Sequence, residues 1–301
     1  MKKRFLIIII TIILFTVGFE LYLRNYWGFC DTVLIQESNK YEYIPQANQN
    51  RFRFRKHVRY NEYSMRSDPL DSTDKLRILG FGDSVINGGV QTEQDSLATS
   101  IIEKKLIKDK GEGYRCCNIS AGSWGPDNCF AYLQEKGDFN ACLIFLVVSS
   151  HDAYDNMIFQ KILDLNPSYP SQQYNSAIFE ILDRYLIPRL LKKKKEEGDR
   201  IVKGNTFNTG FLSFYYYTEE KIPFFIYLHP NKREVKEGQY DEQGNEIIRF
   251  CELYHISLIK GIEYEAVSGF RDDIHLNEQG QRVLANTLLP EIEKLLSTNR
   301  K

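Results

Sequence analysis

The sequence predicts an α/β protein, because short apolar runs alternate with turn-forming and helix-forming segments. Residues 76–79 form an apolar run typical of a buried strand, and the glycines and aspartate after it indicate a sharp turn from strand to helix. Further strand-like runs occupy residues 114–118, 143–148 and 221–228, and a helix-like segment begins around Glu278. Strands that lead through turns into helices are typical of this class.

Composition limits the size of the core and the kinds of partner. The chain has 301 residues, of which 43% are hydrophobic, so it can bury one large core but hardly two. Its net charge of −1 indicates no general affinity for nucleic acid. We expect the basic run at residues 192–195 to be a solvated helix face or loop, because two glutamates follow it.

The N-terminus has the pattern of a membrane anchor. Three basic residues at positions 2–4 precede an uncharged apolar stretch at 5–19, and apolar character resumes at 21–23 after Glu20. As a helix, the nineteen residues 5–23 span about 28 Å, which is close to the thickness of a bilayer core. The basic tip predicts a single pass through the cytoplasmic membrane with the remainder outside. A cleaved signal peptide is the alternative, although no small-x-small cleavage site follows.

We therefore expect three regions. Residues 1–24 form the basic tip and transmembrane signal anchor, and residues 25–73 form an extracytoplasmic linker or edge segment that packs on the main domain. The basic and aromatic residues that alternate in this linker favour an edge strand over a nucleic-acid site. Residues 74–301 form the main domain, with a helical insertion at about 156–221 that we expect to include a cap.

Ser84 lies in the most informative stretch of the chain, Gly-Asp-Ser at the end of the first strand of the main domain. A serine on a strand-to-helix turn can point its Oγ out of the sheet while its own N–H faces the same cleft. One residue can then supply both a nucleophile and an oxyanion donor. Most Gly-Asp-Ser tripeptides are ordinary turns, so this motif alone is weak.

A second motif, Asp-x-x-His, lies 191 residues further on and pairs with the serine. Asp272 precedes His275 by three residues in a turn before the final helix. The carboxylate can hold one ring nitrogen of the histidine, which leaves the other nitrogen to accept a proton from Ser84. The two motifs together are much rarer than either half, and they predict a Ser-His-Asp triad.

With these two motifs the chain resembles the SGNH (GDSL) hydrolases over roughly residues 74–296. The resemblance implies a three-layer α/β/α domain of the flavodoxin-like type with about five parallel strands. It implies Ser84 as nucleophile, His275 as general base and Asp272 as orienting carboxylate. Asp273 lies where the family often has glycine, so a shift of the orienting role by one residue stays open.

The family's two middle motifs supply oxyanion donors, and here both are variant. Counting five residues from Asn118 places Ser123 where the family has a glycine, with Gly122 one residue earlier; either backbone N–H can serve. His151 stands where the family has an asparagine, after the third strand. An imidazole N–H can donate to an oxyanion, so we expect His151 to be a donor. Loss of this donor in a weak enzyme or pseudo-enzyme is the alternative.

Three functions compete for this chain. The first is an ester hydrolase or acyltransferase that acts on O-acyl, most often O-acetyl, groups of carbohydrate or envelope polymers. The second is a lipase or thioesterase for longer acyl esters, and the third is a non-catalytic glycan-binding or assembly protein. We expect an acylated glycan or other small ester as substrate, membrane contact through the N-terminal helix, a possible role in envelope-polysaccharide machinery, and no nucleic acid. No cofactor or metal site is predicted, because no Cys-x-x-Cys pattern occurs.

Overall fold

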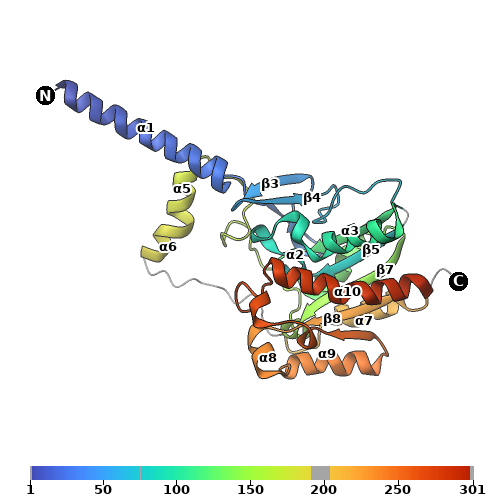
Figure 1. Cartoon of the computed structure of the whole chain (residues 1–301). Coiled ribbons are helices and arrows are strands. Elements are labelled where there is room, and N and C mark those ends of the chain that lie inside the picture. Colours follow the sequence, from blue (N-terminus) through green and yellow to red (C-terminus); the bar gives the residue numbers. More distant parts are fainter. Residues whose placement is uncertain (1, 75, 191–203, 299–301) are drawn as a thin grey trace.

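Five parallel strands form the central sheet of the computed structural model, which describes residues 2–74, 76–190 and 204–298 (Figure 1). Their order in the sheet is β6-β5-β7-β8-β9, and each neighbouring pair is parallel. This is the flavodoxin-like strand order, and it confirms the predicted fold class. The strands are β5 (Leu76–Gly82), β6 (Tyr114–Ser120), β7 (Ala141–Ser149), β8 (Phe224–His229) and β9 (Ser257–Lys260).

Helices cover both faces of the sheet, and two apolar clusters lie between the layers. One face packs against α3 (Ala98–Lys110) and α10 (Glu278–Thr298). The other packs against α4 (Pro126–Lys136), α7 (Thr209–Thr218) and α9 (Glu242–Leu253). The short helices α2 (Ser84–Asn87) and α8 (Lys232–Glu237) follow β5 and β8 at the carboxyl edge of the sheet.

Residues 25–73 pack on this domain as two hairpins. β1 (Ile35–Ser38) pairs with β2 (Glu42–Pro45), and β3 (Gln49–Arg53) pairs with β4 (Lys56–Tyr60), each in a sheet of its own. The alternating basic and aromatic residues, which we expected in an edge strand packed on the domain, lie in the hairpin β3–β4 outside the parallel sheet. A tight turn at residues 54–55, left-handed at both positions, lets β3 and β4 satisfy each other's backbone groups.

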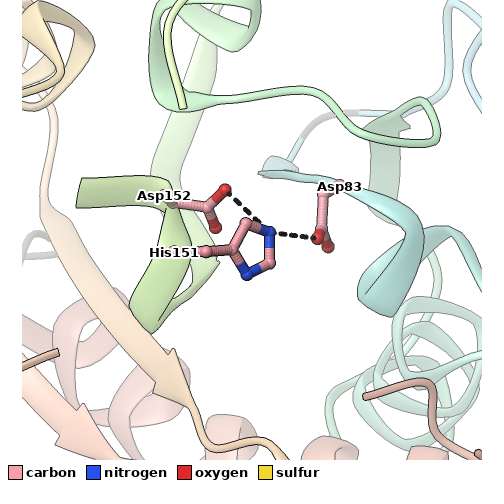
Figure 2. A group of neighbouring side chains, drawn as sticks. All are labelled: Asp83, His151 and Asp152. Carbon is pink, nitrogen blue, oxygen red and sulfur yellow. Dashed lines mark ion pairs between the residues drawn. The ribbon is translucent and has the colours of Figure 1, made fainter. Parts of the chain in front are cut away.

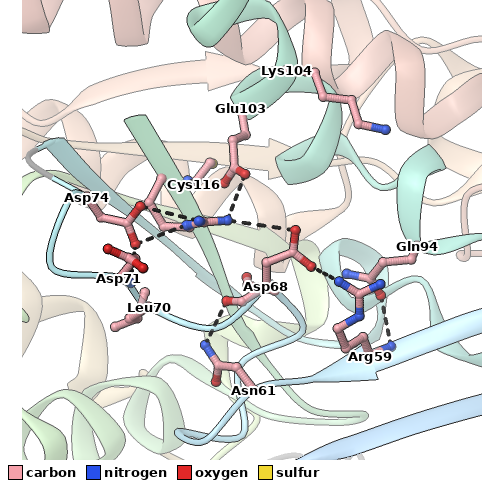
Figure 3. A network of polar contacts seen from close by, with 12 residues as sticks. Arg59, Asn61, Asp68, Leu70, Asp71, Asp74, Gln94, Glu103, Lys104 and Cys116 are labelled. Carbon is pink, nitrogen blue, oxygen red and sulfur yellow. Dashed lines mark hydrogen bonds and ion pairs between the residues drawn. The ribbon is translucent and has the colours of Figure 1, made fainter. Parts of the chain in front are cut away.

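A polar network ties the end of this linker to the edge strand β6. The guanidinium of Arg115 lies 3.2 Å from Asp74 and 2.9 Å from Glu103 of α3. Asp68, which contacts Arg115 at 3.9 Å, also pairs with Arg59 of β4 (Figure 3). Arg115 of β6 and Glu103 of α3 therefore form one charged cluster with Asp68 and Asp74. This cluster lies near the amino-terminal ends of β5 and β6.

The N-terminal helix α1 (Lys2–Trp27) projects from the domain (Figure 1). It is long and apolar enough to cross a membrane, a test that a signal sequence also passes. Only its last turns contact the domain closely: Leu23 is buried, whereas Phe5 and Phe15 are exposed.

The described part of the insertion at 156–221 is only partly helical, and its expected role as a cap stays a prediction. α5 (Ala177–Ile181), a π-helical stretch (Leu182–Leu186) and α6 (Ile187–Leu190) form a continuous helical arm. This arm packs against α1, because polar groups of α1 bind its first turn. The basic run at 192–195 lies outside the described residues.

Candidate active site

Ser84 begins helix α2 directly after β5, at the carboxyl edge of the sheet. Asp83 caps this helix, since its Oδ1 accepts the N–H of Val85 at 2.7 Å. The cap satisfies the N–H of Val85, while Ser84 remains the first residue of the helix, where backbone N–H groups have no partner within the helix. The strand-turn-helix predicted from the sequence is thus present.

The turn before α10 brings His275 to Ser84. His275 Nε2 lies 3.0 Å from Ser84 Oγ. On the other side of the ring, His275 Nδ1 lies 3.0 Å and 2.9 Å from the two carboxylate oxygens of Asp272. Asp272 Oδ1 also accepts the backbone N–H groups of Ile274 and His275, which fixes the carboxylate beneath the ring. The three side chains predicted as a triad therefore form one continuous chain of contacts.

The neighbouring Asp273 is placed differently. Its backbone carbonyl accepts the N–H of Lys232, and its side chain is exposed. The contacts of His275 Nδ1 are with Asp272, so the one-residue shift of the orienting role is not what the geometry favours.

The Asp272 carboxyl is held in its ionised form. Burial raises its pKa, but the two backbone N–H groups and the imidazole of His275 outweigh burial, and the pKa ends below its ordinary value. The carboxylate is half exposed and the imidazole is 30% exposed, so water reaches this side of the site. A solvent-open dyad is more sensitive to salt and water than a buried one.

A buried histidine contacts the turn that carries His275 and holds it in place. His229, at the end of β8, places Nε2 2.7 Å from the carbonyl oxygen of Ile274 and Nδ1 2.8 Å from Glu265 Oε1. Burial lowers the pKa of His229, but Glu265 and the Ile274 carbonyl raise it further, so the net shift is upward. Both ring nitrogens face oxygen atoms, an arrangement that suits the doubly protonated ring.

Arg271 ties the same turn to the helix that carries Ser84. Its Nη1 donates to the carbonyl oxygen of Gly88 at 2.8 Å. Gly88 ends α2 in the left-handed conformation, where glycine is favoured. No sequence pattern predicts the contact of His229 with Ile274 or that of Arg271 with Gly88, because each joins residues far apart in the chain.

The loop after β6 carries Gly122 and Ser123. Tyr43 of β2 donates its hydroxyl to the carbonyl oxygens of Gly122 at 2.7 Å and Ser123 at 3.2 Å, and Tyr169 lies 3.3 Å from the Gly122 oxygen. In a planar trans peptide the C=O of one residue and the N–H of the next point in opposite directions. The N–H of Ser123 therefore points away from Tyr43. Ser123 has φ +56°, a conformation that suits glycine better.

His151 lies between two carboxylates (Figure 2). Its Nε2 is 4.0 Å from Asp83 Oδ2 and 3.5 Å from Asp152 Oδ1. Burial lowers the pKa of His151 more than Asp83 raises it, so the neutral ring is favoured. Because Asp83 immediately precedes Ser84, this imidazole lies beside the start of α2. Whether it donates to an oxyanion stays a prediction.

The same three side chains have the spacing of possible metal ligands. The ligand atoms of Asp83, His151 and Asp152 all lie within 4.8 Å of one another. Asp152 is held by the N–H of Ser149 at 2.7 Å, and burial raises its pKa well above the ordinary value, helped by Asp83 and Asp155. A protonated Asp152 lowers the negative charge around Asp83, so the cluster can be stable without a cation.

An open hollow adjoins the turn that carries His275. It has a volume of about 490 Å³. Arg271 and Asn277, which flank the Asp272–His275 turn, contribute to its wall, and all of its lining residues are polar: Lys56, Gln91, Arg271, Asn277, Glu278 and Gln279.

No protein-family model matches the chain, and no curated protein matches it. Solved structures similar to this chain include acylhydrolases and esterases. TesA is 13% identical over 73% of this chain and 99% of that chain, with a TM-score of 0.46. An alpha/beta hydrolase enzyme from the metagenome of Lake Arreo, Spain, is 14% identical over 73% and 96%, with a TM-score of 0.45. A member of the lipolytic protein G-D-S-L family from Veillonella parvula is 12% identical over 71% and 97%, with a TM-score of 0.40.

Proposed function

We propose that this chain is a serine ester hydrolase that uses Ser84, His275 and Asp272. The observation that supports this most strongly is the continuous contact from Asp272 through His275 to the Ser84 hydroxyl at 3.0 Å. Asp272 accepts the Nδ1 proton of His275 and so leaves the Nε2 lone pair directed at Ser84. Serine next to such a base becomes a nucleophile at neutral pH.

The reaction proceeds in two halves. Ser84 Oγ attacks the ester carbonyl while His275 Nε2 takes the hydroxyl proton, and the same proton then passes to the departing alcohol oxygen. Water attacks the resulting acyl-serine with His275 again as base, which releases the carboxylic acid and restores Ser84. If a sugar hydroxyl replaces this water, the same acyl-enzyme gives acyl transfer.

The oxyanion formed at each step needs donors, and three are proposed. The N–H of Ser84 is one. The N–H of Ser123 is favoured over that of Gly122, because Tyr43 holds the Gly122 carbonyl and thereby directs the N–H of the same peptide to the opposite side. His151 is the third, and its neutral ring has one N–H to donate.

We propose a small acyl group on a carbohydrate or envelope polymer as the substrate, with acetyl the first choice. The open hollow next to the Asp272–His275 turn is lined by charged and amide side chains, which can hydrogen-bond to the hydroxyl groups of a sugar. A lipase or thioesterase would need an apolar channel for the chain. A non-catalytic glycan-binding role would leave the arrangement of Ser84 and His275 without a use.

We further propose that α1 stays attached and holds the domain outside the cytoplasmic membrane. Glu20 of α1 accepts hydrogen bonds from α5, and Leu23 is buried, so the end of α1 is part of the folded structure. Removal of α1 as a signal peptide would delete both groups. Protease accessibility in intact spheroplasts, with N-terminal sequencing of the mature protein, tests this: a mature protein that begins near residue 25 contradicts it.

The function is tested with the full-length protein in detergent. Wild type and Ser84→Ala are assayed against acetylated glycans, short-chain esters and long-chain acyl esters and thioesters. We expect Ser84-dependent release of acetate from glycans and short esters. Ser84-dependent hydrolysis of long chains alone supports the lipase alternative, and no turnover of any ester by folded wild type supports the non-catalytic one.

A further inference from the structure

One side of the helical arm at residues 177–190 carries an exposed apolar face. Phe179 is 56% exposed and Leu190 is 80% exposed, with Leu182 and Leu186 between them at more than 40%. These four residues recur at intervals of three and four, as on one side of a helix. At the start of the arm the opposite side is buried through Ala177 and Glu180, and further along it carries the charged Arg184, which pairs with Glu180. The arm is thus amphipathic, and its apolar side is not covered by the described part of the protein.

The arm is fixed to α1 by hydrogen bonds at its first turn. The carboxylate of Glu20 accepts the backbone N–H groups of Ala177 at 2.7 Å and Ile178 at 3.0 Å, and it contacts the Ser176 hydroxyl at 3.1 Å. Arg24 donates to the carbonyl oxygen of Asn175. Glu20, which interrupts the apolar stretch of α1, therefore caps a helix that lies more than 150 residues away in the sequence.

A second, buried attachment holds the arm on its other side. Glu180 pairs with Arg53 of β3 at 2.7 Å, and both side chains are almost fully buried. Glu180 also accepts the backbone N–H of Cys30 just after α1 and contacts Arg184 on the arm itself. The arm is therefore held between α1 and the hairpin β3–β4, so its apolar face has a defined position.

The arm is attached to α1 at the point where the apolar stretch of that helix ends. In Figure 1 the arm starts beside the domain-proximal part of α1 and runs across the axis of that helix. Exposed apolar side chains of α1 continue up to the attachment point, including Phe15, Phe19 and Leu21. In a bilayer crossed by α1, the arm would lie at the membrane surface and roughly parallel to it.

We propose that residues 177–190 lie in the membrane–water boundary, with Phe179, Leu182, Leu186 and Leu190 inserted among lipids. This inference rests on the proposed membrane span of α1. Amphipathic helices with one apolar side bind membranes in this orientation. Lipid is favoured over a protein partner because the arm begins against the end of the apolar stretch of α1, which lipid already covers in the proposed topology. With two attachments, the catalytic domain is held at one height and tilt above the bilayer.

The test is fluorescence quenching of full-length protein in vesicles of phosphatidylcholine and phosphatidylglycerol. Phe179→Trp and Leu186→Trp report on the arm, and Phe15→Trp reports on α1. Leu253→Trp is the matched control, because Leu253 is an exposed leucine of α9 at 72% exposure. Each variant is compared with the parent protein, which contributes Trp27 and Trp124, in vesicles with and without lipids brominated on the upper acyl chain.

We expect the added emission of Phe179→Trp and Leu186→Trp to be blue-shifted and largely quenched by brominated lipid, and that of Leu253→Trp to be unaffected. If Phe15→Trp is quenched but the arm positions respond only to an aqueous quencher, the arm proposal is wrong and the span of α1 stands. If the arm positions are blue-shifted without quenching by lipid, protein covers them and the proposal is also wrong. If Phe15→Trp is unquenched, the membrane span fails, and the arm proposal fails with it.

Discussion

Replacing Asp272 by asparagine tests whether this carboxylate orients His275 for catalysis or belongs only to an acidic turn. In wild type the Nδ1 atom of His275 contacts both carboxylate oxygens, at 3.0 Å and 2.9 Å. The asparagine side chain keeps one oxygen but replaces the other by an NH₂ group, which favours a ring with its proton on Nε2. Such a ring cannot accept the proton of Ser84.

The size of the effect follows from the exposure of the site. The equivalent change in a buried triad lowers kcat about 10⁴-fold. The Asp272 side chain is half exposed, so water can replace part of its role. We therefore expect kcat to fall about 10²–10³-fold, which corresponds to about 3–4 kcal/mol of transition-state stabilisation. KM is expected to change little, because the carboxylate does not touch the substrate.

Asp273→Asn is the matched control, because it removes the same charge from the adjacent residue and leaves the contacts of His275 intact. Initial rates with a short-chain ester, together with thermal unfolding of each variant, give the comparison. Equal losses in Asp272→Asn and Asp273→Asn, or full activity in Asp272→Asn, would refute the assignment of Asp272. A larger loss in Asp273→Asn would move the orienting role by one residue.

The same substitution has a pH-dependent effect on stability. The pKa of Asp272 is below its ordinary value in the folded protein, so its ionised form adds stability above the pKa of the unfolded chain. That contribution is lost as pH falls through the lower, folded value. Wild type should therefore be more stable than Asp272→Asn at neutral pH, and the difference should shrink below about pH 4. A difference that is constant with pH would contradict the ionisation argument.

Three further predictions concern other parts of the molecule. His151→Ala should lower kcat about 10²–10³-fold with little change in KM, and His151→Asn should recover part of the loss; full activity in His151→Ala would contradict an oxyanion role. Arg53→Met should lower the free energy of unfolding by about 1.5–3 kcal/mol because it removes one of the two guanidinium partners of the buried Glu180 and leaves Arg184, whereas Arg51→Met, in a partly exposed pair, should change it by less than about 1 kcal/mol; equal urea midpoints would contradict this. Burial, with nearby Asp127 and Asp83, raises the pKa of Asp155 to about 8, so the contribution of Asp155 to stability should decline as pH rises from about 4 to 8. Asp155→Asn should unfold at a higher temperature than wild type at pH 8 and not at pH 4, and identical melting curves at pH 8 would contradict it.

The sheet and the Ser84–His275 pairing could be predicted from sequence because both follow from local patterns. Each strand is a short apolar run that ends in a turn, and Asp-x-x-His encodes its own turn through the hydrogen bonds of Asp272. Cys116 and Cys117 are neighbours on β6, so their side chains point to opposite faces of the sheet, and they lie in the two separate apolar clusters. Period and spacing carry this information without knowledge of the tertiary fold.

The hydrogen bonds that hold the loops around the site could not be predicted, because they join segments that are distant in the sequence. Tyr43 reaches the Gly122 loop from a hairpin nearly 80 residues earlier, and His229 reaches the carbonyl oxygen of Ile274 from another strand. The attachment of the helical arm to α1 could not be predicted either, because it depends on Glu20 and Arg24, whose partners lie more than 150 residues away in the sequence.

Covalent labelling of Ser84 tests the central claim most directly. The full-length protein is treated with a fluorophosphonate, which phosphonylates a serine activated by a neighbouring base, and the modified peptide is located by mass spectrometry. We predict modification at Ser84 with parallel loss of esterase turnover, no modification in folded Ser84→Ala, and a fall in the turnover of that variant of about 10⁴-fold or more. Labelling at a different residue, or wild-type turnover by folded Ser84→Ala, would contradict the account.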